Sequence, residues 1–80
     1  MNENSALFSR VQSIVSKVLG LSLEEVDLET SQENSIEWDS MSYLSIMSDI
    51  ESEFDVLISE ENINNFGSVR QIINEIKKFK

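Results

Sequence analysis

Apolar residues recur at helical spacing in three segments of this 80-residue chain, which has no proline and only 2 glycines to interrupt them. Within each segment the apolar side chains stand three or four positions apart, as on one buried face of a helix. The segments are residues 5–19, residues 40–54 and the residues that follow Ser68. A shorter helix is predicted between Ser59 and Gly67. We therefore expect an all-α fold, a small four-helix bundle of three main helices and one short helix, with residues 1–80 forming a single domain.

The segment between the first two predicted helices, residues 20–38, lacks this periodicity and is predicted to form a long loop. Loops of this length are uncommon in compact domains and are often functional. Ser22 and Glu25 stand at the spacing of a capping box, which predicts one short turn within the loop. Four apolar residues are expected to anchor the loop to the core: Val26, Leu28, Ile36 and Trp38.

The second predicted helix begins at Ser40 and has two unlike faces. Its buried stripe is expected to contain Tyr43, Ile46, Met47, Ile50 and Phe54, with Leu44 at the edge. Met41 falls nearly opposite, beside Ser45, Ser48 and Ser52, so an apolar side chain is offered to solvent or to a partner. Ser40 lies where backbone N–H groups lack intrahelical acceptors. A serine there is often a helix cap, but the position also suits an attached phosphate, which the helix dipole attracts.

The composition limits the chemistry of the chain. Without His or Cys, it lacks the commonest general base, the commonest metal ligand and any thiolate or disulfide. So small a bundle also has little room for a sizeable pocket, and no enzyme is expected. No metal site is expected, because residues 27–39 lack the glycine and the final glutamate of a calcium-binding loop.

The distribution of charge bears on partners. The net charge is −9, and no Lys or Arg lies between Lys17 and Arg70, an interval that holds every acidic residue except Glu3 and Glu75. Nucleic acid would be repelled and is not an expected partner. The acidic interval suits basic partner surfaces, or it simply keeps a small domain in solution. No apolar run could span a bilayer and no signal peptide is recognisable, so we expect a cytoplasmic monomer that does not insert into membranes.

From Trp38 to Ile76 the sequence is "WDSMSYLSIMSDIESEFDVLISEENINNFGSVRQIINEI". It resembles the acyl carrier proteins, whose signature Asp-Ser-Leu opens the second helix. In that family the helix ends in an acidic cluster followed by Phe, as "DIESEF" does here. A lone Asp-Ser-apolar triplet would carry little weight, but the triplet at a helix start with matching helices on both sides is specific.

The resemblance implies a carrier whose Ser40 receives 4′-phosphopantetheine from coenzyme A through a separate phosphopantetheinyl transferase. The arm ends in a thiol that carries acyl groups as thioesters, which fits a chain without cysteine. Asp39 is expected to help present Ser40 to the transferase, and Met41 to dock in apolar pockets of the acyl-loading and acyl-processing enzymes, whose docking surfaces would be basic and apolar. The resemblance also implies an acyl-sheltering cavity lined by Ile46, Met47, Ile50, Ile63 and Ile72.

Two departures from the family pattern favour a specialised biosynthetic pathway. Trp38 replaces the small residue usual in fatty-acid carriers, and serines occupy the exposed helix face where those carriers are acidic; Asp49, Glu51 and Glu53 only flank it. We expect weaker steering by charge and a different set of enzymes, such as those for polyketide extender units, peptides or surface polysaccharides. The alternatives are a primary fatty-acid carrier, an aminoacyl or peptidyl carrier and, from another class, a helical protein-binding adaptor without a prosthetic group.

Overall fold

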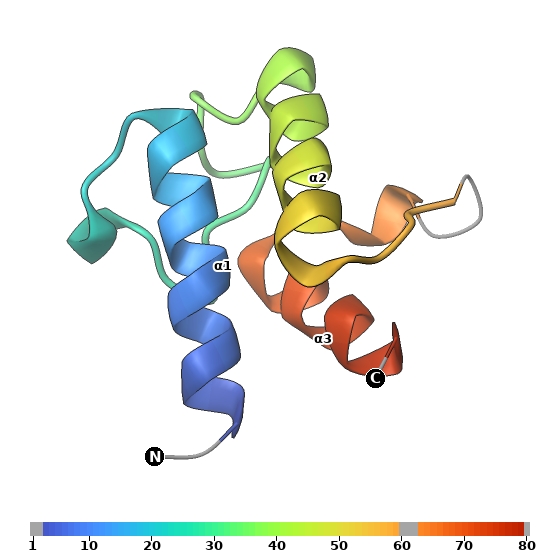
Figure 1. Cartoon of the computed structure of the whole chain (residues 1–80). Helices are drawn as coiled ribbons and strands as arrows, with labels where there is room; N and C mark the ends of the chain where they lie inside the picture. The colour runs from blue at the N-terminus through green and yellow to red at the C-terminus, as the bar shows by residue number, and fades with distance from the viewer. Residues whose placement is uncertain (1–2, 60–62, 80) are drawn as a thin grey trace.

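The computed structural model describes residues 3–59 and 63–79 of the chain, with side chains from residue 6 onward. Its three main helices are α1 (Glu3–Leu19), α2 (Ser40–Phe54) and α3 (Val69–Phe79). Helix α1 packs against both α2 and α3, and α1 and α2 run in opposite directions (Figure 1). None of the described helices is long and apolar enough to cross a membrane.

Two short 3-10 turns complete the helical structure, η1 (Leu23–Glu25) in the long loop and η2 (Ile63–Asn65) before α3. The described residues form no strand, only one isolated bridge between Ser31 and Ser68. The all-helical prediction is therefore confirmed. The short helix predicted after Ser59 corresponds to the single turn η2, although residues 60–62 lie outside the described part of the chain.

The predicted apolar stripes form the core. Leu7, Val11, Val15 and Leu19 contribute from α1; Ile46, Met47, Ile50 and Phe54 from α2; Val69, Ile72, Ile73 and Ile76 from α3. Phe66, which the helical patterns did not include, is also fully buried, whereas Phe79 at the end of α3 is 40% exposed.

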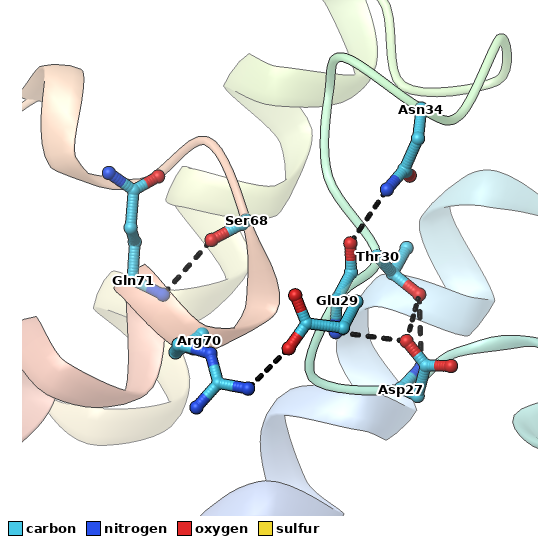
Figure 2. Close-up of polar contacts among 7 residues, drawn as sticks. All are labelled: Asp27, Glu29, Thr30, Asn34, Ser68, Arg70 and Gln71. Atoms are coloured by element: carbon cyan, nitrogen blue, oxygen red, sulfur yellow. Dashed lines mark hydrogen bonds and ion pairs between the residues drawn. The ribbon is translucent and has the colours of Figure 1, made fainter.

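Two of the four predicted loop anchors are correct. Val26 and Trp38 are each 1% exposed, but Leu28 is 37% exposed and Ile36 is 96% exposed. The prediction for Leu28 and Ile36 is wrong. Polar contacts, and not the burial of these two side chains, hold this stretch of the loop. The Asp27 N–H donates to Thr30 Oγ1 over 2.9 Å, the Glu29 N–H donates to the Asp27 carboxylate over 2.9 Å, and the Asn34 amide donates to the Glu29 carbonyl over 2.8 Å (Figure 2).

The same loop closes over the start of α3. The Val69 N–H donates to the Thr30 carbonyl over 3.0 Å, and the Arg70 N–H donates to the Leu28 carbonyl over 3.3 Å. The Arg70 guanidinium pairs with the Glu29 carboxylate, and Ser68 Oγ caps the helix by accepting from the Gln71 N–H (Figure 2). Loop carbonyls thus satisfy helix N–H groups that would otherwise lack partners, which ties the loop to the bundle.

Candidate functional site

Asp39, and not Ser40, caps helix α2. Asp39 is extended, with φ −91° and ψ −171°, and its carboxylate accepts a hydrogen bond from the Ser42 N–H over 2.9 Å. Its carbonyl accepts the Tyr43 N–H over 2.8 Å. The Ser42 hydrogen bond, which favours the charged carboxylate, lowers the pKa of Asp39 below its ordinary value. Because aspartate takes the capping role, the serine after it is released from that role.

Ser40 is the first residue of α2 and is exposed to solvent. Its hydroxyl has no hydrogen-bond partner among the described residues. The N-terminal N–H groups and the positive end of the helix dipole favour an anion at this position. The arrangement therefore offers an accessible oxygen at which an attached phosphate would be electrostatically tolerated, even with the Asp39 carboxylate beside it.

The end of the loop, directly before Ser40, is held by hydrogen bonds and by the buried ring of Trp38. The Trp38 N–H donates to the Ser35 carbonyl over 3.0 Å, and Ser42 Oγ donates to the Glu37 carbonyl over 2.9 Å. The Trp38 ring is buried, and its Nε1 has no hydrogen-bond partner among the described residues. Trp38 is thus a core anchor, and its burial holds Asp39 and Ser40 at the surface.

The first two turns of α2 carry exposed apolar side chains next to Ser40. Met41 is 76% exposed and Leu44 is 61% exposed. Single exposed apolar residues are normal, but these two are three positions apart and so lie on adjacent turns of the helix beside the accessible serine. Ile36, which precedes the helix, is almost fully exposed as well. An apolar contact surface around Ser40 agrees with the role expected for Met41 but does not test it.

Two of the acidic residues toward the end of α2 form polar contacts with other residues of the chain. The Glu51 carboxylate accepts from the Ile58 N–H over 2.8 Å. The Glu53 carboxylate lies 2.9 Å from the guanidinium of Arg10, which also stacks over the Phe54 ring at 4.2 Å from its centroid. Two of the three flanking acids therefore stabilise the fold, while Ser45, Ser48 and Ser52 are exposed. The charge available to a partner on this face is lower than the sequence alone suggests.

A hollow of about 390 Å³ opens directly beside the serine. Its walls come from three parts of the chain, the loop, the first turns of α2 and the segment around η2. The lining residues are Gln32, Ser40, Tyr43, Leu44, Asn64 and Gly67. The hollow is open to solvent and Ser40 is part of its lining, so a flexible chain attached to the Ser40 oxygen would have space within reach.

Sequence reasoning did not identify Gln32, Asn64 or Gly67 as site residues. Asn64 and Gly67 lie far from Ser40 along the chain, Gln32 lies in the aperiodic loop before it, and none of the three belongs to a motif, so no local signal could have found them. The cavity predicted from Ile46, Met47, Ile50, Ile63 and Ile72 stays a prediction, since none of these residues lines the hollow beside Ser40. Among residues 6–59 and 63–79, no cluster of three or more acidic side chains could hold a metal ion.

Comparison with known proteins points to one family. The family model described as a phosphopantetheine attachment site matches residues 9–76. The chain is 36% identical over 74 residues to an acyl carrier protein of Streptococcus thermophilus (strain CNRZ 1066), a match that covers 91% of this chain and 99% of the relative. It is 31% identical over 78 residues to an acyl carrier protein of Borrelia garinii subsp. bavariensis, covering 98% of each. An acyl carrier protein of Trieres chinensis is 30% identical over 70 residues, covering 88% of each.

Proposed function

This chain belongs to the acyl carrier protein family, which carries its cargo on phosphopantetheine and is not a family of enzymes, and from that premise we propose that Ser40 bears the 4′-phosphopantetheine arm. The observation that carries the proposal is the exposed Ser40 hydroxyl, which no described residue engages because Asp39 caps the helix. When bound, the arm supplies the thiol that this sequence lacks.

Attachment would be a simple exchange of phosphorus–oxygen bonds. A bond forms between Ser40 Oγ and the phosphorus next to the pantetheine of coenzyme A, and the pyrophosphate bond of coenzyme A breaks. The nucleotide half of coenzyme A leaves, and the hydroxyl proton passes to a base of the transferase. The chain itself holds the oxygen at the surface and orients it at the positive end of α2.

Asp39 and Met41 serve this site in different ways. Asp39 is a positioning residue, since its carboxylate and carbonyl define the first turn that holds Ser40 outward. Met41 is a docking residue, because an apolar side chain that is 76% exposed can enter an apolar pocket of the transferase or of an acyl-processing enzyme.

We further propose a specialised pathway for this carrier. The exposed serines of α2 and the internal pairing of Glu51 and Glu53 support a weakly charged docking face. Attraction to a basic partner would then depend less on salt than it does for a carrier with a fully acidic helix. Primary fatty-acid synthesis and aminoacyl or peptidyl transfer are the competing assignments, and the cytoplasmic location and monomeric state remain predictions.

The attachment is tested by incubating the protein with a broad-specificity transferase and coenzyme A and measuring the intact mass. We expect a gain equal to one phosphopantetheine in the parent protein and in Ser45→Ala, whose exposed serine lies on the same helix, but no gain in Ser40→Ala. A gain in Ser40→Ala would refute Ser40 as the attachment point. No gain in the parent with several transferases would favour an adaptor without an arm.

The pathway is tested by loading the modified protein with a panel of acyl and aminoacyl donors, using the cognate loading enzymes of each pathway. Preference for an oxygenated short acyl group supports the specialised assignment, whereas preference for an aminoacyl group would support the aminoacyl or peptidyl role. Preference for malonyl loading followed by elongation to plain fatty acyl chains would support the primary role instead.

A further inference from the structure

We infer that Trp38 selects the cargo of this carrier by donating a hydrogen bond from its buried indole N–H to an oxygen atom on a short acyl group. The inference rests on the proposed attachment of phosphopantetheine to Ser40. It deepens that proposal by naming the residue that determines specificity and the chemical class of cargo, an acyl group that carries a hydroxyl or carbonyl oxygen beyond the thioester.

The indole nitrogen of Trp38 is the one buried polar side-chain atom without a hydrogen-bond partner among the described residues. The side chain is 1% exposed and belongs to the hydrophobic core. By contrast, the buried polar residues Ser16, Thr30 and Glu75 each make at least one side-chain hydrogen bond. A buried donor without an acceptor destabilises the fold, and such groups are rare in native proteins. The N–H is therefore available to an acceptor that the described chain does not supply.

The surroundings of Trp38 favour an acceptor that is tethered at Ser40. A buried water would need two to four polar partners, but the side chains of the described core cluster are apolar. An oxygen carried on a covalent arm needs only the one donor. Trp38 lies two residues before Ser40, and its backbone N–H is bonded to the Ser35 carbonyl over 3.0 Å. The fixed end of the loop thus keeps the indole within reach of a group attached to Ser40.

The ring of Trp38 also limits the size of the cargo. Trp38 and Phe66 are the two largest side chains among the described residues that are less than 2% exposed, and both belong to the core cluster. Because protein cores are close-packed, the volume that these two rings occupy is not available to a long aliphatic chain. Met47, in the same cluster and 7% exposed, has a flexible side chain that can adjust around a short group.

Both properties of Trp38 favour the same cargo. A short acyl group with an oxygen would give the indole N–H its acceptor, whereas a plain acyl group of the same length would leave the donor unpaired. A site that hydrogen-bonds an oxygen discriminates strongly against the analogue that lacks it. A long plain chain would in addition force the core to repack, which is destabilising.

The test observes the indole directly, because Trp38 is the single tryptophan of the chain and gives one indole N–H resonance by NMR. A transferase that accepts acyl-coenzyme A loads the protein with a butyryl or a β-hydroxybutyryl arm, and intact mass verifies each product. We expect the indole proton of the β-hydroxybutyryl form to lie downfield of its position in the butyryl form. It should also exchange with solvent several-fold more slowly, up to about tenfold, as one net hydrogen bond allows.

Equal indole shifts and exchange rates in the two loaded forms, each of the correct mass, would overturn the role of Trp38 while leaving the attachment at Ser40 intact. Absence of any mass gain in the parent protein would overturn both proposals.

Two variants separate the N–H from the packing of the ring. In the parent protein the β-hydroxybutyryl form should unfold at a higher temperature than the butyryl form. Trp38→Phe keeps an aromatic ring but lacks the donor, so this difference should disappear. Phe66→Leu loses a buried ring but keeps the donor, and should retain the difference. Circular dichroism checks that both variants fold, and the indole measurement in the parent decides the question if either does not. A difference that persists in folded Trp38→Phe would contradict the inference.

Discussion

Replacement of Ile50 by alanine tests whether the helix that presents Ser40 is held by the core as the structure indicates. Ile50 lies in the middle of α2 and is 0% exposed. The change deletes three carbons, and at about 0.8 kcal/mol for each buried methylene the transfer loss alone is about 2.4 kcal/mol. The residual cavity adds to this loss, so we expect a destabilisation of about 3–4 kcal/mol, within the range of about 2–5 kcal/mol typical of such changes.

This loss is large for so small a protein. A domain of 80 residues has a free energy of unfolding of about 4–12 kcal/mol at typical values per residue. With a urea m-value of about 1–3 kcal/mol/M, the unfolding midpoint should fall by at least about 1 M. The assay is urea unfolding followed by far-ultraviolet circular dichroism, which reports helix content, analysed as a two-state transition.

The matched control is Leu44→Ala, on the same helix but 61% exposed. It should change stability by no more than about 0.5 kcal/mol. If the two variants lose similar stability, or if Ile50→Ala loses less than about 1 kcal/mol, the assignment of the buried face of α2 is wrong.

Three further predictions concern the site. Met41→Glu should leave the circular dichroism spectrum unchanged but slow modification by the transferase or acyl transfer, and unchanged rates in both assays would remove Met41 from the docking surface. The folded-state pKa of Asp39 is lowered, so its charge stabilises the fold above the ordinary pKa of 3.8, and this contribution is lost as pH falls through the folded-state pKa. Urea midpoints measured from pH 6 to pH 2.5 (roughly the window of that titration) should therefore fall less steeply in Asp39→Asn than in the parent protein. Parallel profiles in the two proteins would contradict the capping role of Asp39. Trp38→Phe removes a buried N–H without a described partner but keeps an aromatic ring, so it should be less destabilised in urea unfolding than Trp38→Leu, which lacks both the N–H and the ring. The reverse order would contradict the packing of an aromatic ring at this position of the core.

Local patterns were sufficient for the helices. The apolar spacing of residues 40–54 matches α2 (Ser40–Phe54), and α3 (Val69–Phe79) directly follows Ser68, as the sequence predicts. The capping-box spacing of Ser22 is also realised in part, since the Glu25 carboxylate accepts from the Ser22 N–H over 2.9 Å. These features depend on side chains within one or two turns of each other, and such short-range relations can be seen in the order of residues.

Loop side chains were harder to place for a physical reason. An apolar residue in a loop has no periodicity that says which way it points, so Trp38 and Ile36 look equally suitable as anchors. The structure buries Trp38 and exposes Ile36. Thr30 Oγ1 accepts from the Asp27 N–H and the Asn34 amide donates to the Glu29 carbonyl, so polar contacts hold the loop without Ile36 as an anchor.

By itself, the sequence determined the helical class, the buried faces and the serine at the start of α2, since each follows from spacing along one segment. Only the tertiary structure decided that Asp39 takes the cap and leaves Ser40 free, and that Gln32, Asn64 and Gly67 meet beside it. Those residues come from the loop and from the segment before α3, and contacts between distant segments depend on how the whole chain packs, which no local pattern records.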